Sequence, residues 1–338
     1  MVFIDDALVR AMRAGESVRG TTSPNPPVGA VILDQDGDIV GVGATQPPGG
    51  PHAEIKALRA AGDKARGGTA VVTLEPCNHT GRTGPCAQAL IDAGIARVFF
   101  LHRDPGAKEG GGADTLRQAG VTARHISARR EEPDAVATWL RAVAMERPHV
   151  TVKFAQTLDG FTAAPDGSSQ WITGPAAREL VHEDRARRDA IVVGTGTALS
   201  DNPSLTARFP DGSLRGNQPR RVVIGKRRLE AASIPNLTRL GFEQYPDIDT
   251  AMTKLYRSGA RDVLVEGGAG LIQSFFKAGL VDAIQAYLAP VLLGGGRGVV
   301  AGALTDTLSG AERFEPVRVK SCGPDIVWEL ERREEESE

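Results

Sequence analysis

The chain has 338 residues, of which 24% are charged and 41% hydrophobic, and its formal net charge is −2. This length and composition are typical of a globular protein with two domains, and the acidic balance argues against a general nucleic-acid or membrane-surface binder. No apolar run approaches the roughly 18 residues of a membrane span, and three cysteines make no disulfide framework. The start, MVFIDDALVRAM, carries acids where a signal peptide needs basic residues, so we expect a cytoplasmic protein.

Helical and strand patterns alternate along the first part of the chain. Apolar spacing predicts helices at 4–16, 52–65, 85–94, 113–120 and 133–148. Apolar runs between them predict strands at 28–33, 39–44, 69–74, 97–101 and 121–126. Such alternation indicates an α/β sheet with some parallel pairs. We place the first domain at 1–147 and the second at 148–338.

The second domain is also predicted to be α/β. Helices are expected at 176–188, near 249–258 and at 271–279. Strands are expected in 149–163, 190–194, 220–225, 262–268 and 283–295, with a closing pair at 314–322 and 325–331. We expect the closing pair to be antiparallel.

Three residues of the first domain are typical zinc ligands. His52 begins a predicted helix, Cys77 follows a predicted strand, and Cys86 opens another helix. One imidazole and two thiolates suit Zn²⁺ and leave the fourth tetrahedral position for water, whose pKa falls toward about 7. Glu54, two residues after His52, is placed to move a proton between that water and a leaving amine.

A ligand followed by x-Glu and then by Pro-Cys is the zinc deaminase pattern, although here the cysteines lie nine residues apart rather than three. Other interpretations stay open. The cysteines could be small buried hydrophobes, or the site could be structural, in which case it needs a fourth protein ligand. His79 is the nearest candidate, but it could equally face a substrate.

The segments TTSPNPPVGAVIL, PHAEIKAL and TLEPCNHTGRTGPC resemble the first half of the bifunctional riboflavin-biosynthesis deaminase/reductase family. The expanded loop with Gly-Arg-Thr before the second cysteine separates this family from other deaminases. The resemblance implies a cytidine-deaminase-like three-layer domain that hydrolytically deaminates 2,5-diamino-6-(5-phosphoribosylamino)pyrimidin-4(3H)-one. His52, Cys77 and Cys86 are then the zinc ligands and Glu54 the proton shuttle.

The same resemblance implies three substrate contacts near the zinc. Asn25 would hold the pyrimidine, although an Asx turn before Pro26 also explains it. His79 and Arg82 would lie near the substrate, and a guanidinium suits the ribose phosphate. The sequence departs from the family at Gly84 and in the loop 104–112, and both departures bear on substrate placement rather than on the metal.

Loops rich in Gly, Thr, Asp and Arg follow the strands of the second domain, as in SSQWITG, GTGTALSDNPSLTAR and EGGAGL. Ligands collect at the carboxyl ends of the strands of an α/β sheet, so we expect these loops to share one cleft. The glycines of EGGAGL allow a backbone to approach a phosphate, although a tight turn explains them equally well. GTGTAL lacks the third glycine of a dinucleotide fingerprint.

The resemblance extends over this half and implies a dihydrofolate-reductase-like α/β domain that uses NADPH to reduce the ribose of 5-amino-6-(5-phosphoribosylamino)uracil to ribitol. The implied cofactor contacts are Ala155, Trp171, Thr197, Asp201, Lys226, Gly268, Ala269, Gly270, Leu271, Ile272, Gln273 and Ser274. The implied substrate contacts are Lys153, Ser169, Arg185, Leu205, Arg208 and Glu266. Alternatively, Trp171 is a core aromatic, Leu205 only packs, and Arg185 lies on a solvated helix face.

Three basic residues, Lys226, Arg227 and Arg228, follow the strand 220–225, and we hypothesise that their charge favours NADPH over NADH. The expected partners are the phosphoribosylaminopyrimidine substrates and further copies of the chain through the reductase domain, without nucleic acid or membrane. Three rival interpretations remain at this point. They are a nucleic-acid base deaminase, which predicts a basic groove, a non-catalytic zinc-stabilised binding protein, and an enzyme in which one half has lost its activity.

Overall fold

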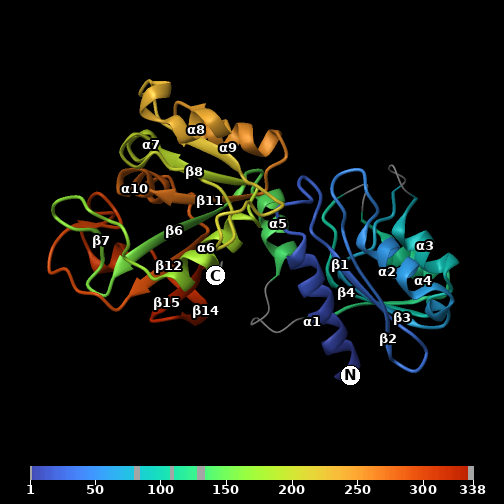
Figure 1. Ribbon diagram of the computed structural model, residues 1–338. Coiled ribbons are helices and arrows are strands. Elements are labelled where there is room, and N and C mark those ends of the chain that lie inside the picture. The colour runs from blue at the N-terminus through green and yellow to red at the C-terminus, as the bar shows by residue number, and fades with distance from the viewer. Residues whose placement is uncertain (1, 80–83, 107–109, 128–133, 334–338) are drawn as a thin grey trace. The chain divides into compact units, whose positions relative to one another are not determined.

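The computed structural model describes residues 2–79, 84–106, 110–127 and 134–333. The chain divides into two compact units, Met1–Met145 and Glu146–Glu338, and each is described by itself (Figure 1). In the described part of the chain, no helix is both long and apolar enough to cross a membrane.

The first unit is built on a five-stranded sheet in the order β2-β1-β3-β4-β5. The strands are β1 (Gly29–Leu33), β2 (Ile39–Ala44), β3 (Thr69–Leu74), β4 (Arg97–His102) and β5 (Thr122–His125). β1 pairs antiparallel with β2 and β3, whereas β3, β4 and β5 run parallel. The parallel pairing that the alternating pattern predicts is therefore present.

Helices cover both faces of this sheet and make three layers (Figure 1). The helices are α1 (Val2–Ser17), α2 (Ala53–Ala61), α3 (Cys86–Asp92), α4 (Gly112–Gln118) and α5 (Ala135–Ala144), with a short 3₁₀ turn at Gly62–Ala65. α1 packs Ala11 and Met12 against Val31 of β1 on one face. The helices α2, α3 and α4 pack on the other face, where Ala57, Leu90 and Leu116 are buried. Both faces of β1 and β3 are covered, which explains their unbroken apolar runs GAVIL and TAVVTL.

The first turn of α2 lies directly on the backbone of β2. A Cβ atom at Gly43 would lie 2.2 Å from the carbonyl oxygen of Ala53, the first residue of α2. Only glycine allows this approach, because every other residue brings a Cβ into that space. Gly43 therefore sets the position of the turn that carries His52 and Glu54.

The second unit is built on an eight-stranded sheet in the order β10-β9-β8-β11-β6-β12-β15-β14. The strands are β6 (His149–Thr157), β8 (Ala190–Gly194), β9 (Arg220–Ile224), β10 (Glu243–Tyr245), β11 (Asp262–Gly267), β12 (Ala283–Ala289), β14 (Phe314–Cys322) and β15 (Asp325–Arg332). The strands from β10 to β12 are parallel, and the closing pair β14–β15 is antiparallel, which confirms that prediction. Two shorter strands, β7 (Phe161–Ala163) and β13 (Arg297–Gly298), form a separate pair.

Helices again lie on both faces of the sheet, and alternate residues of β8, β9 and β11 point into the two cores. The helices are α6 (Pro175–Arg185), α7 (Thr195–Asp201), α8 (Pro235–Leu240), α9 (Ile248–Arg257) and α10 (Ala269–Lys277), with 3₁₀ turns at Ala231–Ser233 and Leu308–Gly310. Val192 of β8 faces the core that α9 and α10 cover, whereas Ile191 faces the core that α7 and α8 cover.

α7, α8 and β10 are among the elements of this unit that are absent from the sequence prediction. α7 covers the segment TGTALSD, where a glycine and several small polar residues indicated a loop. It ends at Asn202, which adopts a left-handed backbone with φ of 41° and closes the helix. The helix α8 and the strand β10 are too short for a periodic pattern to be recognised.

Candidate active sites

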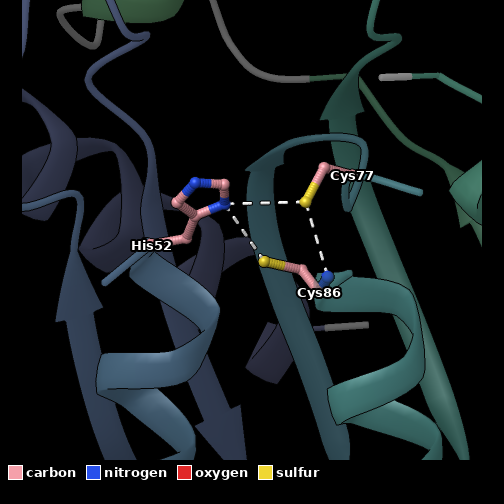
Figure 2. A group of neighbouring side chains, drawn as sticks. All are labelled: His52, Cys77 and Cys86. Atoms are coloured by element: carbon pink, nitrogen blue, oxygen red, sulfur yellow. Dashed lines mark hydrogen bonds between the residues drawn. The ribbon is translucent and has the colours of Figure 1, made fainter. Parts of the chain in front are cut away.

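The three predicted zinc ligands meet at one point of the first unit (Figure 2). The Nδ1 atom of His52 lies 3.6 Å from the Sγ atom of Cys77 and 3.3 Å from the Sγ atom of Cys86. All three ligand atoms lie within 4.8 Å of one another, and one imidazole with two thiols is a donor set that fits zinc. His79 is not part of this group, so the described residues offer three protein ligands and not four.

Each ligand stands at the end of a rigid element. His52 is the residue before α2, Cys77 follows β3, and Cys86 is the first residue of α3. The backbone N–H of Cys86 donates a hydrogen bond to Cys77 Sγ at 3.4 Å, which holds the two sulfurs together. The expanded loop between the cysteines is described only up to His79 and again from Gly84. Arg82 therefore lies outside the described residues.

The two thiols interact as a coupled pair. A hydrogen bond from the Cys86 thiol is the largest cause that lowers the pKa of Cys77, to about 4. The same hydrogen bond, followed by burial, raises the pKa of Cys86. This hydrogen bond therefore favours the thiolate of Cys77, and a divalent cation would compete for the proton of Cys86.

Glu54 lies in the first turn of α2 and is 4% exposed. Burial, the largest cause, and the charge on Cys77 raise its pKa to about 7. Glu54 and Cys86 each influence the pKa of the other, so the carboxyl lies close to this ligand. A buried carboxyl beside a three-ligand metal group is the arrangement that acid–base chemistry on a bound water requires.

Two further predicted contacts of the first unit are described. His79 is half-buried, and its Nδ1 atom is buried without a hydrogen-bond partner among the described residues. Asn25 is half-buried in the loop before β1, and its backbone N–H donates to the carbonyl oxygen of Thr22 in a turn.

The second unit contains a cavity of about 850 Å³. Its walls come from β6, α6, α7, the loop around residue 171, the segment 208–212 and the start of α10. Of the residues predicted to contact cofactor or substrate, those lining it are Lys153, Ala155, Ser169, Trp171, Arg185, Thr197, Asp201, Arg208, Glu266, Gly268, Ala269 and Ile272. The expectation that the glycine-rich loops share one cleft is therefore confirmed.

An ion pair stands in the wall of this cavity. Both guanidinium nitrogens Nε and Nη2 of Arg185 donate to Glu266, at 2.7 and 2.6 Å, and the two side chains are 15% and 7% exposed. Burial is the largest influence on the pKa of Glu266 and acts to raise it. The charge of Arg185 acts against burial and brings this pKa down to about 2. Arg185 is therefore not on a solvated helix face. Burial lowers the pKa of the third charged group, Lys153.

The glycine-rich start of α10 lies beside α7. The backbone N–H of Gly268 donates to Thr197 Oγ1 at 2.8 Å, so α7 and the start of α10 form one edge of the cavity. This edge has small residues and a helix N-terminus, which fits the phosphates of a dinucleotide. Trp171 is 68% exposed, and Arg178 stacks on its ring at 4.6 Å, so Trp171 is not a core aromatic.

The remaining predicted contacts do not line the cavity. Leu205 is 2% exposed and belongs to the apolar core between the sheet and α8, which agrees with the alternative that it only packs. Lys226 is exposed after β9, while the guanidinium of Arg227 would lie 3.3 Å from a Cβ at Gly196 on α7. The other predicted contacts outside the lining are Gly270, Leu271, Gln273 and Ser274.

Sequence reasoning missed several polar residues of the cavity, among them Arg178 and His182 of α6. Arg178 and His182 lie seven and three residues before Arg185, so with it they occupy one face of that helix. This spacing was the only sequence signal that could have found them.

A three-ligand metal group in a three-layer α/β unit, followed by a large cavity in a second α/β unit, is typical of an enzyme with two active sites. Residues 4–102 match the family described as "Cytidine and deoxycytidylate deaminase zinc-binding region", and residues 148–328 match the "RibD C-terminal domain". The chain is 60% identical to the riboflavin biosynthesis protein RibD of Corynebacterium ammoniagenes over 95% of this chain and 96% of that protein. It is 45% identical to RibD of Mycobacterium tuberculosis over 98% of both chains. The chain therefore belongs to the RibD family of riboflavin biosynthesis.

Solved structures agree over the whole chain. The diaminohydroxyphosphoribosylaminopyrimidine deaminase/5-amino-6-(5-phosphoribosylamino)uracil reductase of Thermotoga maritima matches with a TM-score of 0.86 and 31% identity, covering 98% of this chain and 99% of that one. Acinetobacter baumannii RibD matches with a TM-score of 0.82 and 32% identity over similar shares. The family and both units predicted from the sequence are thus confirmed.

Proposed function

We propose that the first unit hydrolytically deaminates 2,5-diamino-6-(5-phosphoribosylamino)pyrimidin-4(3H)-one. His52, Cys77 and Cys86 hold zinc, which when bound makes a water molecule nucleophilic near neutral pH. Glu54 takes a proton from the attacking water and delivers it to the leaving amine. The observation that carries this proposal is the convergence of three ligand atoms beside a buried carboxyl.

We propose that the second unit reduces the ribose of 5-amino-6-(5-phosphoribosylamino)uracil to ribitol, with hydride supplied by bound NADPH. Thr197, Gly268 and Trp171 stand where the dinucleotide would lie along the cavity edge. Arg208 is free to meet the substrate phosphate, while Arg185 and Glu266 hold each other in one orientation. Cofactor and substrate that fill the cavity would together exclude water from the hydride transfer.

The remaining predicted contacts are assigned by the same proposal. In the first unit, Asn25 and His79 face the pyrimidine, and Arg82 meets the ribose phosphate. In the second unit, Lys153 and Ser169 bind the substrate, and the residues of 268–274 that follow Gly268 support the cofactor from α10. We place the boundary between the two activities next to Pro148.

A paired measurement tests both activities on the full chain. The diaminopyrimidine substrate is supplied with and without NADPH, and ammonia release and NADPH oxidation are followed separately. Glu54→Gln should abolish ammonia release while the chain still oxidises NADPH with the deaminated intermediate. Glu266→Gln should abolish NADPH oxidation while the chain still releases ammonia. Each variant therefore serves as the control for the other. Ammonia release without NADPH oxidation in the unaltered chain would refute the reductase assignment.

We also propose that the protein acts in the cytoplasm as a homo-oligomer joined through the second unit, without nucleic acid. The supporting feature is an apolar strip on the outer strands, where Val317, Val319, Ile326 and Trp328 are 38% to 61% exposed. Val319 pairs with Trp328 across β14 and β15, so their side chains share one face. Light scattering should give a smaller particle for a Val319→Glu, Trp328→Glu double variant, and an unchanged mass would reject this interface.

A further inference from the structure

His182 is a cavity residue whose protonation pattern is set by its neighbours. It lies on α6, and its Nδ1 atom is 3.0 Å from the carbonyl oxygen of Thr206. A carbonyl oxygen only accepts hydrogen bonds, so Nδ1 must carry the hydrogen. Arg185 donates to the same carbonyl oxygen from Nη1, also at 3.0 Å, which holds the Thr206 peptide in place.

The ring is neutral at physiological pH. Burial, the largest cause, and the charges of Arg185 and Arg208 lower the pKa of His182 to about 4, although Glu266 acts in the opposite direction. A neutral imidazole has one N–H, and here it is on Nδ1. Nε2 is then an acceptor, and among the described residues it has no hydrogen-bond partner.

Two of the three charged side chains that influence the pKa of His182 belong to arginines. The guanidinium groups of Arg185 and Arg208 have only donors. Both oxygens of Glu266 already accept hydrogen bonds from Arg185. A hydroxyl of a sugar phosphate whose phosphate sits on Arg208 can therefore donate to Nε2 of His182, an acceptor that lines the cavity together with these two arginines.

We propose that His182 is a substrate-binding residue of the reductase site, whose Nε2 accepts a hydrogen bond from a sugar hydroxyl of the phosphoribosylamino substrate. The inference rests on the proposed reductase function and adds a contact to it. The hydrogen bond selects a substrate with a hydroxylated sugar chain next to its phosphate. It also holds that chain in one orientation while hydride is transferred.

Two substitutions separate this role from a structural one. In His182→Asn the amide nitrogen replaces Nδ1 and keeps the bond to Thr206, but nothing replaces Nε2. In His182→Gln the side-chain oxygen reaches the place of Nε2, while the bond to Thr206 is lost. We expect kcat/KM for the deaminated substrate to fall about 10- to 100-fold in the Asn variant and to recover to within about threefold in the Gln variant. The KM for NADPH and the release of ammonia by the first unit should not change in either.

A substrate analogue completes the test. Analogues that lack single sugar hydroxyls are supplied to the unaltered chain and to His182→Asn. For one of them, the two proteins should give the same kcat/KM, because the hydrogen bond is then absent from both. The opposite order of the two variants, with Asn active and Gln impaired, would show that His182 only supports Thr206 and would overturn the inference. The inference would also be overturned if His182→Asn lowered kcat/KM by the same factor for every analogue. An unaltered chain that does not oxidise NADPH with the substrate would instead reject the reductase function itself.

Discussion

The buried ion pair of the second unit gives a prediction with a definite size. In Glu266→Gln the bidentate partner of Arg185 loses its charge, while Arg185 and Lys153 keep theirs in a buried environment. The pKa of Glu266 is about 2 instead of its ordinary 4.5, which corresponds to about 3 kcal/mol of folding free energy. Breaking a buried pair by removing one partner generally costs about 3–5 kcal/mol, so both routes give a similar value.

The effect should depend on pH in a particular direction. Because the folded-state pKa is depressed, the carboxylate stabilises the folded protein above pH 4.5, and that contribution is lost as the pH falls toward 2. The free energy of unfolding of the unaltered chain should therefore exceed that of Glu266→Gln by about 3 kcal/mol near pH 7. The difference should shrink steadily below pH 4.5.

Urea denaturation followed by tryptophan fluorescence measures this difference. A Trp139→Phe background leaves Trp171 and Trp328, which both report on the second unit. The matched control is Glu243→Gln, which breaks a second bidentate Arg–Glu pair of the same sheet. The side chains of that pair are 33% and 36% exposed, so the expected loss is about 1 kcal/mol or less. Equal losses in the two variants would refute the reasoning from burial.

Two further predictions concern placement and cofactor choice. Gly43→Ala should displace the first turn of α2, cost about 1–3 kcal/mol of stability and reduce ammonia release more than NADPH oxidation. Gly216→Ala, where nothing lies within 4 Å of the added Cβ, is the control, and equal effects of the two substitutions on ammonia release would contradict the packing argument. Lys226→Glu should reduce the preference for NADPH over NADH about tenfold, by charge repulsion from the additional phosphate. Steady-state kinetics with both cofactors measure this preference, and Lys64→Glu, at an exposed lysine of the first unit, is the control. An unchanged preference in Lys226→Glu rejects the hypothesis.

Most of the fold was predictable from the sequence because the strands are apolar and the helices amphipathic. The run TAVVTL is buried at every position, and the predicted strand 69–74 coincides with β3. α7 was not predicted because its sequence, TGTALSD, has few apolar residues and begins with threonine and glycine, which disfavour helices. Its position is decided by packing of Ala198 on the sheet, which no local pattern contains.

The metal group was predictable because its ligands stand at element boundaries that the sequence marks clearly. The reductase cavity was predictable only in outline. Leu205 was placed among the contacts by resemblance, although its side chain turns into the core. His182 was overlooked because a histidine on a charged helix gives no local sign that Arg185, Arg208 and Thr206 surround it.

The zinc content of the purified full chain tests the central claim most directly. Elemental analysis should find one zinc per chain, and the zinc should be lost in Cys86→Ser and in His52→Ala. Cys322→Ser is the matched control, since Cys322 is a buried cysteine of the other unit and should not affect the metal. A chain without zinc, or zinc that survives the double substitution Cys77→Ser, Cys86→Ser, would contradict the account.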